Sequence, residues 1–224
     1  MFVTYFLTSF TVRFVYALFL LARPTTNHIN TSTHNNMRKL IFFMHTSLDG
    51  FVAGPNGELN WAKVNDEVFD FVGTMTNDAD TALYGRVTYE LMESYWPNAG
   101  NQPNATKHDK EHAVWYSKVS KVVLSKTLSE EGLNNTTVIG DQLVDNINKI
   151  KNQEGKNILI FGSPTASHSL LSVDLIDEFW LFVNPVLLGK GMPLFKGVNE
   201  ITKLNLMETK VFPCGVVALH YEKN

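Results

Sequence analysis

The sequence from residue 37 onward predicts an α/β domain with three layers, α/β/α, around a mixed and mainly parallel sheet that ends in an antiparallel hairpin. Two observations lead to this prediction. Short apolar runs of strand length alternate along the chain with segments of helical periodicity, a pattern typical of parallel strands joined by helices. The last two apolar runs are joined only by Pro213-Cys214-Gly215, which is a connection of hairpin length.

The first half of this region contains two predicted strands and three predicted helices. The strands are expected over 39–47 and 81–84, and the helices over 66–75, 87–95 and 108–117. The 39–47 run is mostly apolar, as a central strand buried on both faces requires. Asn65 stands where a helix N-cap is needed, and Pro97 is expected to end the second helix before it.

The second half continues the alternation. Strands are expected over 121–125, 138–139, 157–161, 178–183, 206–212 and 216–221, and helices over 143–152 and 166–171. Gly155 follows the first of these helices, where a glycine is favoured beyond a helix end. Neither an internal repeat nor a linker interrupts the region, so residues 37–224 are predicted to form one domain.

The first 36 residues differ from the rest. Residues 2–22 are nearly all apolar or hydroxyl-bearing and are long enough to cross a bilayer, but Arg13 lies at their centre, where a charge costs roughly 2.5–3.5 kcal/mol. The stretch lacks the basic start of a secretory signal, and residues 25–36 are polar and typical of a linker. We therefore expect an N-terminal extension outside the fold, with Met37 as the natural start. A membrane tether or a targeting segment is the alternative.

Composition excludes several classes of function. The formal charge of −3 gives no clustered basic face for nucleic acid, and 44% apolar with 18% charged residues is ordinary for a globular protein. A single cysteine, Cys214, excludes a disulfide within the chain and a cysteine zinc site, and a small, partly buried residue is its expected role.

Two further motifs suggest other enzymes but fit them poorly. His108 and His112 match the H-x-x-E-H pattern of inverted zinc peptidases. The segment is highly charged and follows a polar loop, so a solvated helix face is the preferred interpretation and no metal is predicted. Ser163 follows a strand as a hydrolase nucleophile does, but its surroundings are not the G-x-S-x-G elbow.

Two strand-to-helix junctions carry the features that a nucleotide phosphate needs. Each offers a glycine for close backbone approach, a hydroxyl, and a helix N-terminus with free N–H groups. The residues are Gly85, Arg86 and Thr88 at the first junction, and Gly162, Ser163, Thr165 and Ala166 at the second. Each junction alone is compatible with an ordinary turn, and their pairing on one sheet favours a phosphate site. At a third junction, Ser125 and Lys126 combine a hydroxyl and a cation suited to an adenosine 2′-phosphate, although a surface strand end is the simpler interpretation.

These residues, taken together, resemble the dihydrofolate-reductase-like superfamily, in the branch shared with the reductase domain of bacterial riboflavin biosynthesis. The resemblance runs from about Met37 to Tyr221 in the order and spacing of the family, and covers none of residues 1–36. The motifs are Ser47-Leu48-Asp49-Gly50, the segment 83–90 (LYGRVTYE), Phe161-Gly162-Ser163, Leu175-Ile176-Asp177-Glu178 and the segment 184–195 (NPVLLGKGMPLF).

The resemblance implies a three-layer dihydrofolate-reductase-like fold, NADPH as the hydride donor and often a homodimer. A cytoplasmic location is also expected. It assigns the phosphates to the first two junctions and the adenosine 2′-phosphate to Ser125 and Lys126. Pro164 departs from the glycine that relatives commonly carry, and it removes one N–H donor.

On the substrate side the resemblance proposes two catalytic carboxylates, Asp66 and Asp49. Burial beside a nicotinamide would raise the pKa of such a group and let it protonate the substrate. For Asp66 the alternative is a first-turn acid favoured by the helix dipole, and for Asp49 a turn residue. Trp61 and Tyr89 are candidates for the pocket wall, with core packing as the alternative for Tyr89.

The predicted function is an NADPH-dependent reductase that transfers a hydride to a small heterocyclic metabolite. Candidates are 5-amino-6-(5-phosphoribosylamino)uracil of riboflavin biosynthesis and a pterin or dihydrofolate. The zinc deaminase half of the bifunctional riboflavin enzyme needs H-x-E and P-C-x-x-C, which this chain lacks. The alternative is a non-catalytic NADPH-binding or interaction protein on the same fold.

Overall fold

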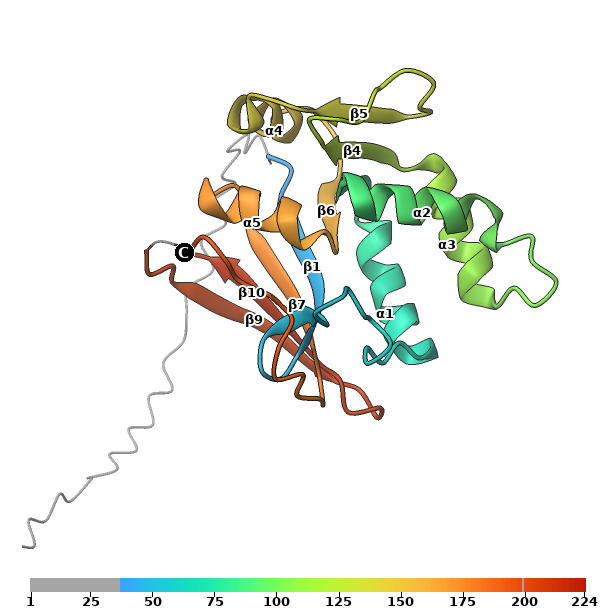
Figure 1. Cartoon of the computed structure of the whole chain (residues 1–224), viewed down its shortest axis with the longest axis vertical. Helices are drawn as coiled ribbons and strands as arrows, with labels where there is room; N and C mark the ends of the chain where they lie inside the picture. Colours follow the sequence, from blue (N-terminus) through green and yellow to red (C-terminus); the bar gives the residue numbers. More distant parts are fainter. Residues whose placement is uncertain (1–36, 199) are drawn as a thin grey trace, which may run out of the picture. The chain divides into compact units, whose positions relative to one another are not determined.

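An eight-stranded sheet in the order β5-β4-β3-β6-β1-β7-β10-β9 organises the protein (Figure 1). The computed structural model describes residues 37–198 and 200–224, so the predicted extension over residues 1–36 lies outside the described part and stays a prediction. The strands of the large sheet are β1 (Leu40–Ser47), β3 (Ala79–Gly85), β4 (Ser120–Leu124), β5 (Thr136–Ile139), β6 (Asn157–Phe161), β7 (Glu178–Asn184), β9 (Leu204–Val211) and β10 (Val217–Lys223). The helices are α1 (Asp66–Asn77), α2 (Arg86–Ala99), α3 (Lys107–Lys118), α4 (Leu143–Lys151) and α5 (Pro164–Ser172). Within these residues, no helix has both the length and the apolarity that a bilayer crossing requires.

The strand directions confirm the predicted fold class. β1 pairs in parallel with β6 and β7, and β3 pairs in parallel with β4 and β6, while β10 runs antiparallel to both β7 and β9. Two short strands, β2 (Phe51–Ala53) and β8 (Met192–Pro193), form a separate antiparallel pair that the sequence did not predict. The carboxyl ends of the parallel strands therefore share one edge of the sheet, where ligands bind in folds of this kind.

The core consists of two apolar layers, one on each face of the sheet. Alternate residues along β1 enter different layers: Ile41 and Phe43 face α1, α2 and α3, whereas Phe42 and Met44 face α4 and α5. This period of two is why a central strand appears as a continuous apolar run. Figure 1 shows the two groups of helices on opposite sides of the sheet, which gives the predicted three layers.

Side chains cap the starts of α1 and α3, and the observed end of α2 differs from the predicted one. Asn65 is the N-cap of α1, and its side chain accepts a hydrogen bond from Val68 N at 3.1 Å. The predicted end of α2 before Pro97 is wrong, because the helix continues to Ala99. Pro97 stands in the last turn, where it removes only one helical hydrogen bond, and the fully buried Ala99 holds the helix end against the protein.

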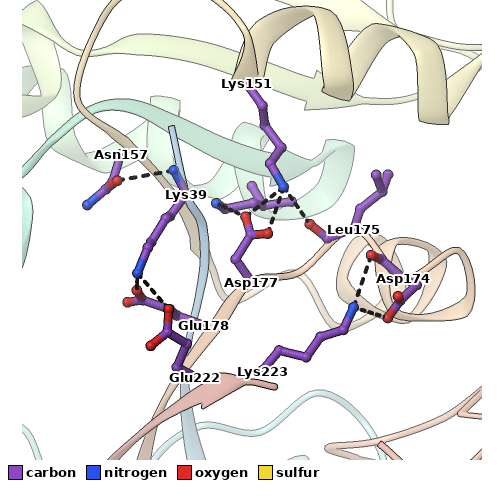
Figure 2. A network of polar contacts seen from close by, with 10 residues as sticks. Lys39, Lys151, Asn157, Asp174, Leu175, Asp177, Glu178, Glu222 and Lys223 are labelled. Carbon is purple, nitrogen blue, oxygen red and sulfur yellow. Dashed lines mark hydrogen bonds and ion pairs between the residues drawn. The ribbon is translucent and has the colours of Figure 1, made fainter. Parts of the chain in front are cut away.

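The amino-terminal edge of the sheet carries a network of ion pairs (Figure 2). Lys39 at the start of β1 contacts Glu178 of β7 and Glu222 of β10, and these two carboxylates raise the pKa of Lys39 to about 12. Lys151 at the end of α4 contacts both carboxylate oxygens of Asp177, at 2.8 and 2.7 Å. These charges occupy the edge opposite to the carboxyl ends of the strands, where the candidate site residues gather.

Candidate cofactor and substrate site

The two predicted phosphate junctions form one continuous surface. They follow β3 and β6, which are neighbours in the sheet. The N–H of Gly85 donates a hydrogen bond to Ser163 Oγ at 2.7 Å, which links the two junctions directly. A methyl group built on Gly85 would lie 3.4 Å from Ala166 Cβ, and one built on Gly162 would lie 3.9 Å from Thr88 Cγ2. The N-termini of α2 and α5 therefore begin side by side at the carboxyl edge.

The backbone of the second junction has a shape suited to an anion. Gly162 and Ser163 both have left-handed conformations, with φ of 57° and 55°, and Ser163 is 5% exposed. Successive N–H groups in such turns form anion-binding concavities, and here they run into the start of a helix. Pro164 is the first residue of α5, where an N–H has no partner within the helix. A proline is therefore favourable for the helix at this position, but the junction has one N–H donor fewer for an anion.

The charged side chain of the first junction is available to a ligand at small cost. Arg86 Nη1 lies 2.8 and 3.0 Å from the two carboxylate oxygens of Glu90, one helical turn further along. Both side chains are more than 40% exposed, and an exposed pair of this spacing contributes only about 0.3–0.5 kcal/mol. Thr165, at the second junction, is exposed and lines a cavity of 730 Å³ that also contains Lys190 and Lys196.

The third predicted junction lies at the same edge, at the end of β4. Ser125 Oγ accepts hydrogen bonds from the N–H groups of Thr127 at 3.1 Å and Leu128 at 3.0 Å, so it shapes its own turn. The Lys126 side chain is 80% exposed, and its Nζ lies 3.8 Å from Asp141. Lys126 thus extends into solvent beyond the strand adjacent to β3.

The expected burial of Asp66 is wrong. Its side chain is 93% exposed at the first position of α1, and its Oδ1 lies 3.5 Å from Nε2 of His108. Because α1 begins at this residue, the carboxylate projects from the free end of the helix into water. This is the position that the helix dipole favours for an acid, and it gives Asp66 no apolar surroundings.

Asp49 is an anchor between two loops. Its carboxylate accepts hydrogen bonds from Ser47 Oγ at 2.6 Å, from Gly189 N at 2.7 Å and from Leu188 N at 3.1 Å. These donors, with the Ser47 hydroxyl first, hold the pKa of Asp49 below its ordinary value. A carboxylate stabilised in its ionised form is a poor proton donor, so these contacts favour a role for Asp49 in positioning the two loops, and its catalytic role stays a prediction.

The two predicted pocket residues differ in exposure. Trp61 is half-buried in the loop before α1, and its indole N–H donates to Glu58 O at 2.9 Å. Tyr89 is only 4% exposed and packs beside Tyr84, with its hydroxyl 3.3 Å from Thr136 Oγ1 on β5. This burial on the sheet side of α2 favours the alternative given for Tyr89, core packing, and its role as a substrate contact stays a prediction.

The two histidines of α3 do not lie on a solvated face, contrary to the prediction. His108 is 12% exposed and stacks on Phe69 with ring centroids 5.1 Å apart. His112 packs against Trp96 at 4.0 Å, and burial lowers the pKa of His112 to about 4. The charged residues of this helix face outward while the histidines share its inner face. Over the described ranges, no group of histidine, cysteine and carboxylate side chains is arranged to hold a metal ion.

A row of aromatic rings packs on the α1–α3 side of the sheet, which the sequence pattern did not reveal. Its members, with centroids 4.0–5.7 Å apart along the row, are Trp96, His112, Trp115, Phe161, Phe43, His45 and Phe182. We call this row the aromatic platform. It runs from α2 and α3 to the carboxyl half of β1 and β7, beside Gly162. Phe161 and Phe182 belong to the buried core, whereas Phe43 and His45 at the carboxyl half of β1 are partly exposed and can contact a planar ring.

His45 is the polar side chain of the aromatic platform on β1. Its Nδ1 lies 3.3 Å from Nδ2 of Asn184, and burial lowers the pKa of His45 to about 4, so the imidazole is neutral at pH 7. Its Nε2 makes no hydrogen bond to residues 37–198 or 200–224. A histidine within an apolar strand is the signal that was available in the sequence, since a polar residue on a buried face is unusual.

The fold is that of dihydrofolate reductases. The dihydrofolate reductase of Enterococcus faecalis, in complex with NADP(H), has this fold: it superposes with a TM-score of 0.55 at 15% identity, over 83% of this chain and 96% of that one. Residues 38–218 match the RibD C-terminal domain, and the chain belongs to this family.

Two relatives are similar over nearly their whole length. The uncharacterized protein YyaP of Bacillus subtilis is 34% identical over 197 residues, which cover 85% of this chain and 98% of YyaP. A protein named for riboflavin biosynthesis from Shewanella sp. PV-4 is 26% identical in sequence, with a TM-score of 0.64, over 83% of this chain and 99% of that one. The suspected membership of the branch of the RibD C-terminal domain is confirmed by the family match over residues 38–218.

Proposed function

We propose that this protein is an NADPH-dependent reductase of a small planar heterocycle. The observation that carries the proposal is the hydrogen bond between Gly85 and Ser163, which joins two helix N-termini into one anion-binding surface. A dinucleotide needs such a surface for its pyrophosphate, and two independent junctions on neighbouring strands supply it. When bound, NADPH supplies the hydride.

The residues around this surface fit a dinucleotide. The N–H groups of Gly162, Ser163, Thr165 and Ala166 face the anion at the start of α5, and Arg86 adds a guanidinium after release from Glu90. Lys126 and Ser125 stand one strand further along the edge, where an adenosine 2′-phosphate would meet a cation. A preference for NADPH over NADH is expected because Arg86 and Lys126 are cations that the extra phosphate of NADPH can contact.

The aromatic platform supports a planar substrate. Phe43 and His45 are partly exposed near the carboxyl end of β1, so a heterocycle that stacks on them lies at the same sheet edge as the cofactor surface. His45 Nε2–H donates a hydrogen bond to a ring carbonyl or ring nitrogen, since its Nδ1 is held by Asn184. The family relationship favours 5-amino-6-(5-phosphoribosylamino)uracil, with pterins and dihydrofolate as the next substrates to assay. The proposal includes a cytoplasmic location, which a membrane tether in residues 1–36 would change.

The first experiment is fluorescence titration of the full chain with NADPH and with NADH. We expect saturable binding that favours NADPH, and Lys126→Ala is expected to weaken NADPH binding about tenfold while leaving NADH unchanged. Lys118→Ala, at the far end of α3, is the matched control and is expected to bind both nucleotides as the parent does. If neither nucleotide binds, the reductase proposal is wrong. Equal weakening of both nucleotides by Lys126→Ala would exclude the 2′-phosphate role.

A non-catalytic NADPH-binding protein is the second candidate, and one observation favours it. Neither Asp49 nor Asp66 stands as a buried acid that can deliver a proton. Turnover distinguishes the two candidates: oxidation of NADPH that depends on an added heterocycle supports the reductase. Tight NADPH binding without oxidation in the presence of the ribosylaminouracil, pterins and dihydrofolate supports the non-catalytic alternative.

A further inference from the structure

Asn184, the last residue of β7, carries a polar side chain that is buried at the carboxyl edge of the sheet. It is 1% exposed, and in the parallel pairing of β7 with β1 it stands opposite Ser47, close to His45 on the same strand. A buried amide costs free energy unless its oxygen and its N–H groups have hydrogen-bond partners. The partners of Asn184 therefore show what its amide does at this edge.

The partners of Asn184 determine which end of its amide carries the hydrogens. Oδ1 lies 2.8 Å from the backbone nitrogen of Lys63, and a backbone N–H can only donate. Nδ2 lies 3.0 Å from the carbonyl oxygen of Phe182 and 3.4 Å from that of Thr46, and a carbonyl oxygen can only accept. A flipped amide would place N–H against N–H and oxygen against two oxygens. The backbone therefore fixes the orientation of this side chain.

The amide in turn fixes the tautomer of His45. Nδ2 of Asn184 lies 3.3 Å from Nδ1 of His45, so an amide N–H group faces this ring nitrogen. A proton on Nδ1 would point at that N–H group, so Nδ1 is the acceptor and the proton of the ring is on Nε2. Burial lowers the pKa of His45 to about 4, so the ring stays neutral at pH 7. Nε2 is therefore a donor and has no free lone pair.

Nε2 of His45 is available to a ligand. It makes no hydrogen bond within the residues that the structure describes, and no buried side-chain nitrogen or oxygen among these residues lacks a partner, so Nε2 contacts solvent. The ring of His45 is partly exposed, and its centroid lies 5.7 Å from that of Phe43. A planar ligand that stacks on Phe43 and His45 and displaces this solvent meets an N–H donor from His45 and no acceptor.

We propose that Asn184 is a positioning residue that determines specificity: it holds His45 as a donor only, and thereby selects rings that present a carbonyl oxygen or an unprotonated nitrogen to Nε2. This inference rests on the proposed planar substrate and narrows it to rings of the lactam type. A ring with an amino group at the same place brings donor against donor, and neither group keeps its hydrogen bond. A site of this kind discriminates because the mismatched ring leaves polar groups unpaired.

Nitrogen NMR of the full chain with isotope-labelled histidine tests the tautomer directly, because protonated and unprotonated imidazole nitrogens have different chemical shifts. At pH 8 we expect the parent protein to show a protonated Nε2 and an unprotonated Nδ1 in His45. Asn184→Asp replaces the donor by a carboxylate acceptor of the same shape and is expected to move the proton to Nδ1. Asn148→Asp, the same exchange at an exposed position of α4, is the matched control and is expected to leave both signals unchanged.

The dissociation constants of two probe rings test the consequence for specificity. 6-Aminouracil carries a carbonyl group at one ring position where 6-aminocytosine carries an amino group. In titrations at pH 8 we expect the parent and Asn148→Asp to bind 6-aminouracil at least about tenfold more tightly, and Asn184→Asp to lose or reverse this preference. His45→Gln offers both a donor and an acceptor, so it is expected to bind the two rings within about threefold. This variant keeps the buried Asn184 and remains informative if Asn184→Asp does not fold.

The outcomes separate this inference from the reductase function. A proton on Nδ1 in the parent, or an unmoved proton in Asn184→Asp with a parent-like melting temperature, overturns the inference. Equal affinity of the parent for the two rings, or no affinity for either, also overturns it. Selective binding of 6-aminouracil without oxidation of NADPH by any heterocycle supports the inference and contradicts the reductase function. Oxidation of NADPH that proceeds equally with carbonyl and amino rings overturns the inference alone.

Discussion

Replacement of Ser163 by alanine tests the link between the two cofactor junctions. The hydroxyl of Ser163 accepts the N–H of Gly85 at 2.7 Å, and the side chain is 5% exposed. An unsatisfied buried N–H costs roughly 1–3 kcal/mol. Gly85 is only half-buried, so water partly replaces the hydroxyl and the lower end of this range applies. We therefore expect Ser163→Ala to lower the free energy of unfolding by about 1–1.5 kcal/mol.

A glycine at the same position separates the hydrogen bond from the backbone conformation. Ser163 has φ of 55°, a region where a residue with a Cβ is less stable than glycine by roughly 1–2 kcal/mol. Ser163→Gly loses the same hydroxyl but gains this relief, which the greater entropy of unfolded glycine partly offsets. We expect the glycine variant to be more stable than the alanine variant and to bind NADPH equally weakly.

Urea unfolding followed by tryptophan fluorescence measures the stability, with an unchanged m-value as the sign of a common unfolded state. NADPH titration of the same variants measures the cofactor surface, and we expect a several-fold weaker affinity. Ser169→Ala is the matched control, since Ser169 lies on the exposed side of α5, and we expect a change within about 0.5 kcal/mol. Parent-like stability and NADPH affinity in Ser163→Ala would refute the reasoning.

Four further predictions concern the remaining site residues. Burial holds the pKa of His112 at about 4 instead of 6.5, so the unfolded chain binds more protons than the folded one below pH 6.5. The free energy of unfolding therefore falls between pH 6.5 and pH 4, by at most about 3 kcal/mol from this group. His112→Gln is expected to remove this part of the fall, as measured by urea unfolding at each pH. Asp49→Ala removes the acceptor for the N–H groups of Leu188 and Gly189, so we expect faster hydrogen exchange of these two amides by NMR. Unchanged exchange would contradict the anchor role. His45→Phe keeps the ring packing against Phe182 and removes the N–H, so we expect a higher KM for the heterocycle with unchanged NADPH affinity. Asp66→Asn is expected to retain kcat/KM within about threefold, and a much larger loss would restore its catalytic role.

The fold was predictable because burial imposes a period on the sequence. β1, β6 and β7 are buried on both faces, so they appear as continuous apolar runs, and the connecting helices show one apolar face each. The antiparallel hairpin was predictable from the short turn at Pro213. β2 and β8 were not, because three and two residues are too few to show alternation. Their pairing depends on a close approach of Gly191 to the backbone of Ala53, where a Cβ would not fit.

The junctions of the proposed phosphate surface are easier to locate from sequence than the walls of a substrate pocket, because they use backbone groups. A glycine and a hydroxyl at a strand-to-helix junction place N–H groups at a helix start whatever the surrounding side chains are. The substrate pocket depends on side-chain burial, which spacing does not determine. Tyr89 has the sequence context of a pocket residue, but its position on α2 turns it toward the sheet. His112 has the context of a solvated helix, but it faces Trp96 and Trp115.

Side-chain burial also decides which group can donate the proton in the proposed reaction. A carboxylate serves as an acid near pH 7 only where apolar surroundings raise its pKa, and neither Asp49 nor Asp66 has such surroundings. His45 is buried enough, but burial lowers the pKa of an imidazole, so it remains neutral and contributes a hydrogen bond instead of a proton. In the proposed reaction, the side chains of the protein therefore bind and orient the substrate through hydrogen bonds, and water protonates the reduced ring. A reductase built in this way depends on the basicity of its substrate, which favours heterocycles whose own nitrogen accepts the proton.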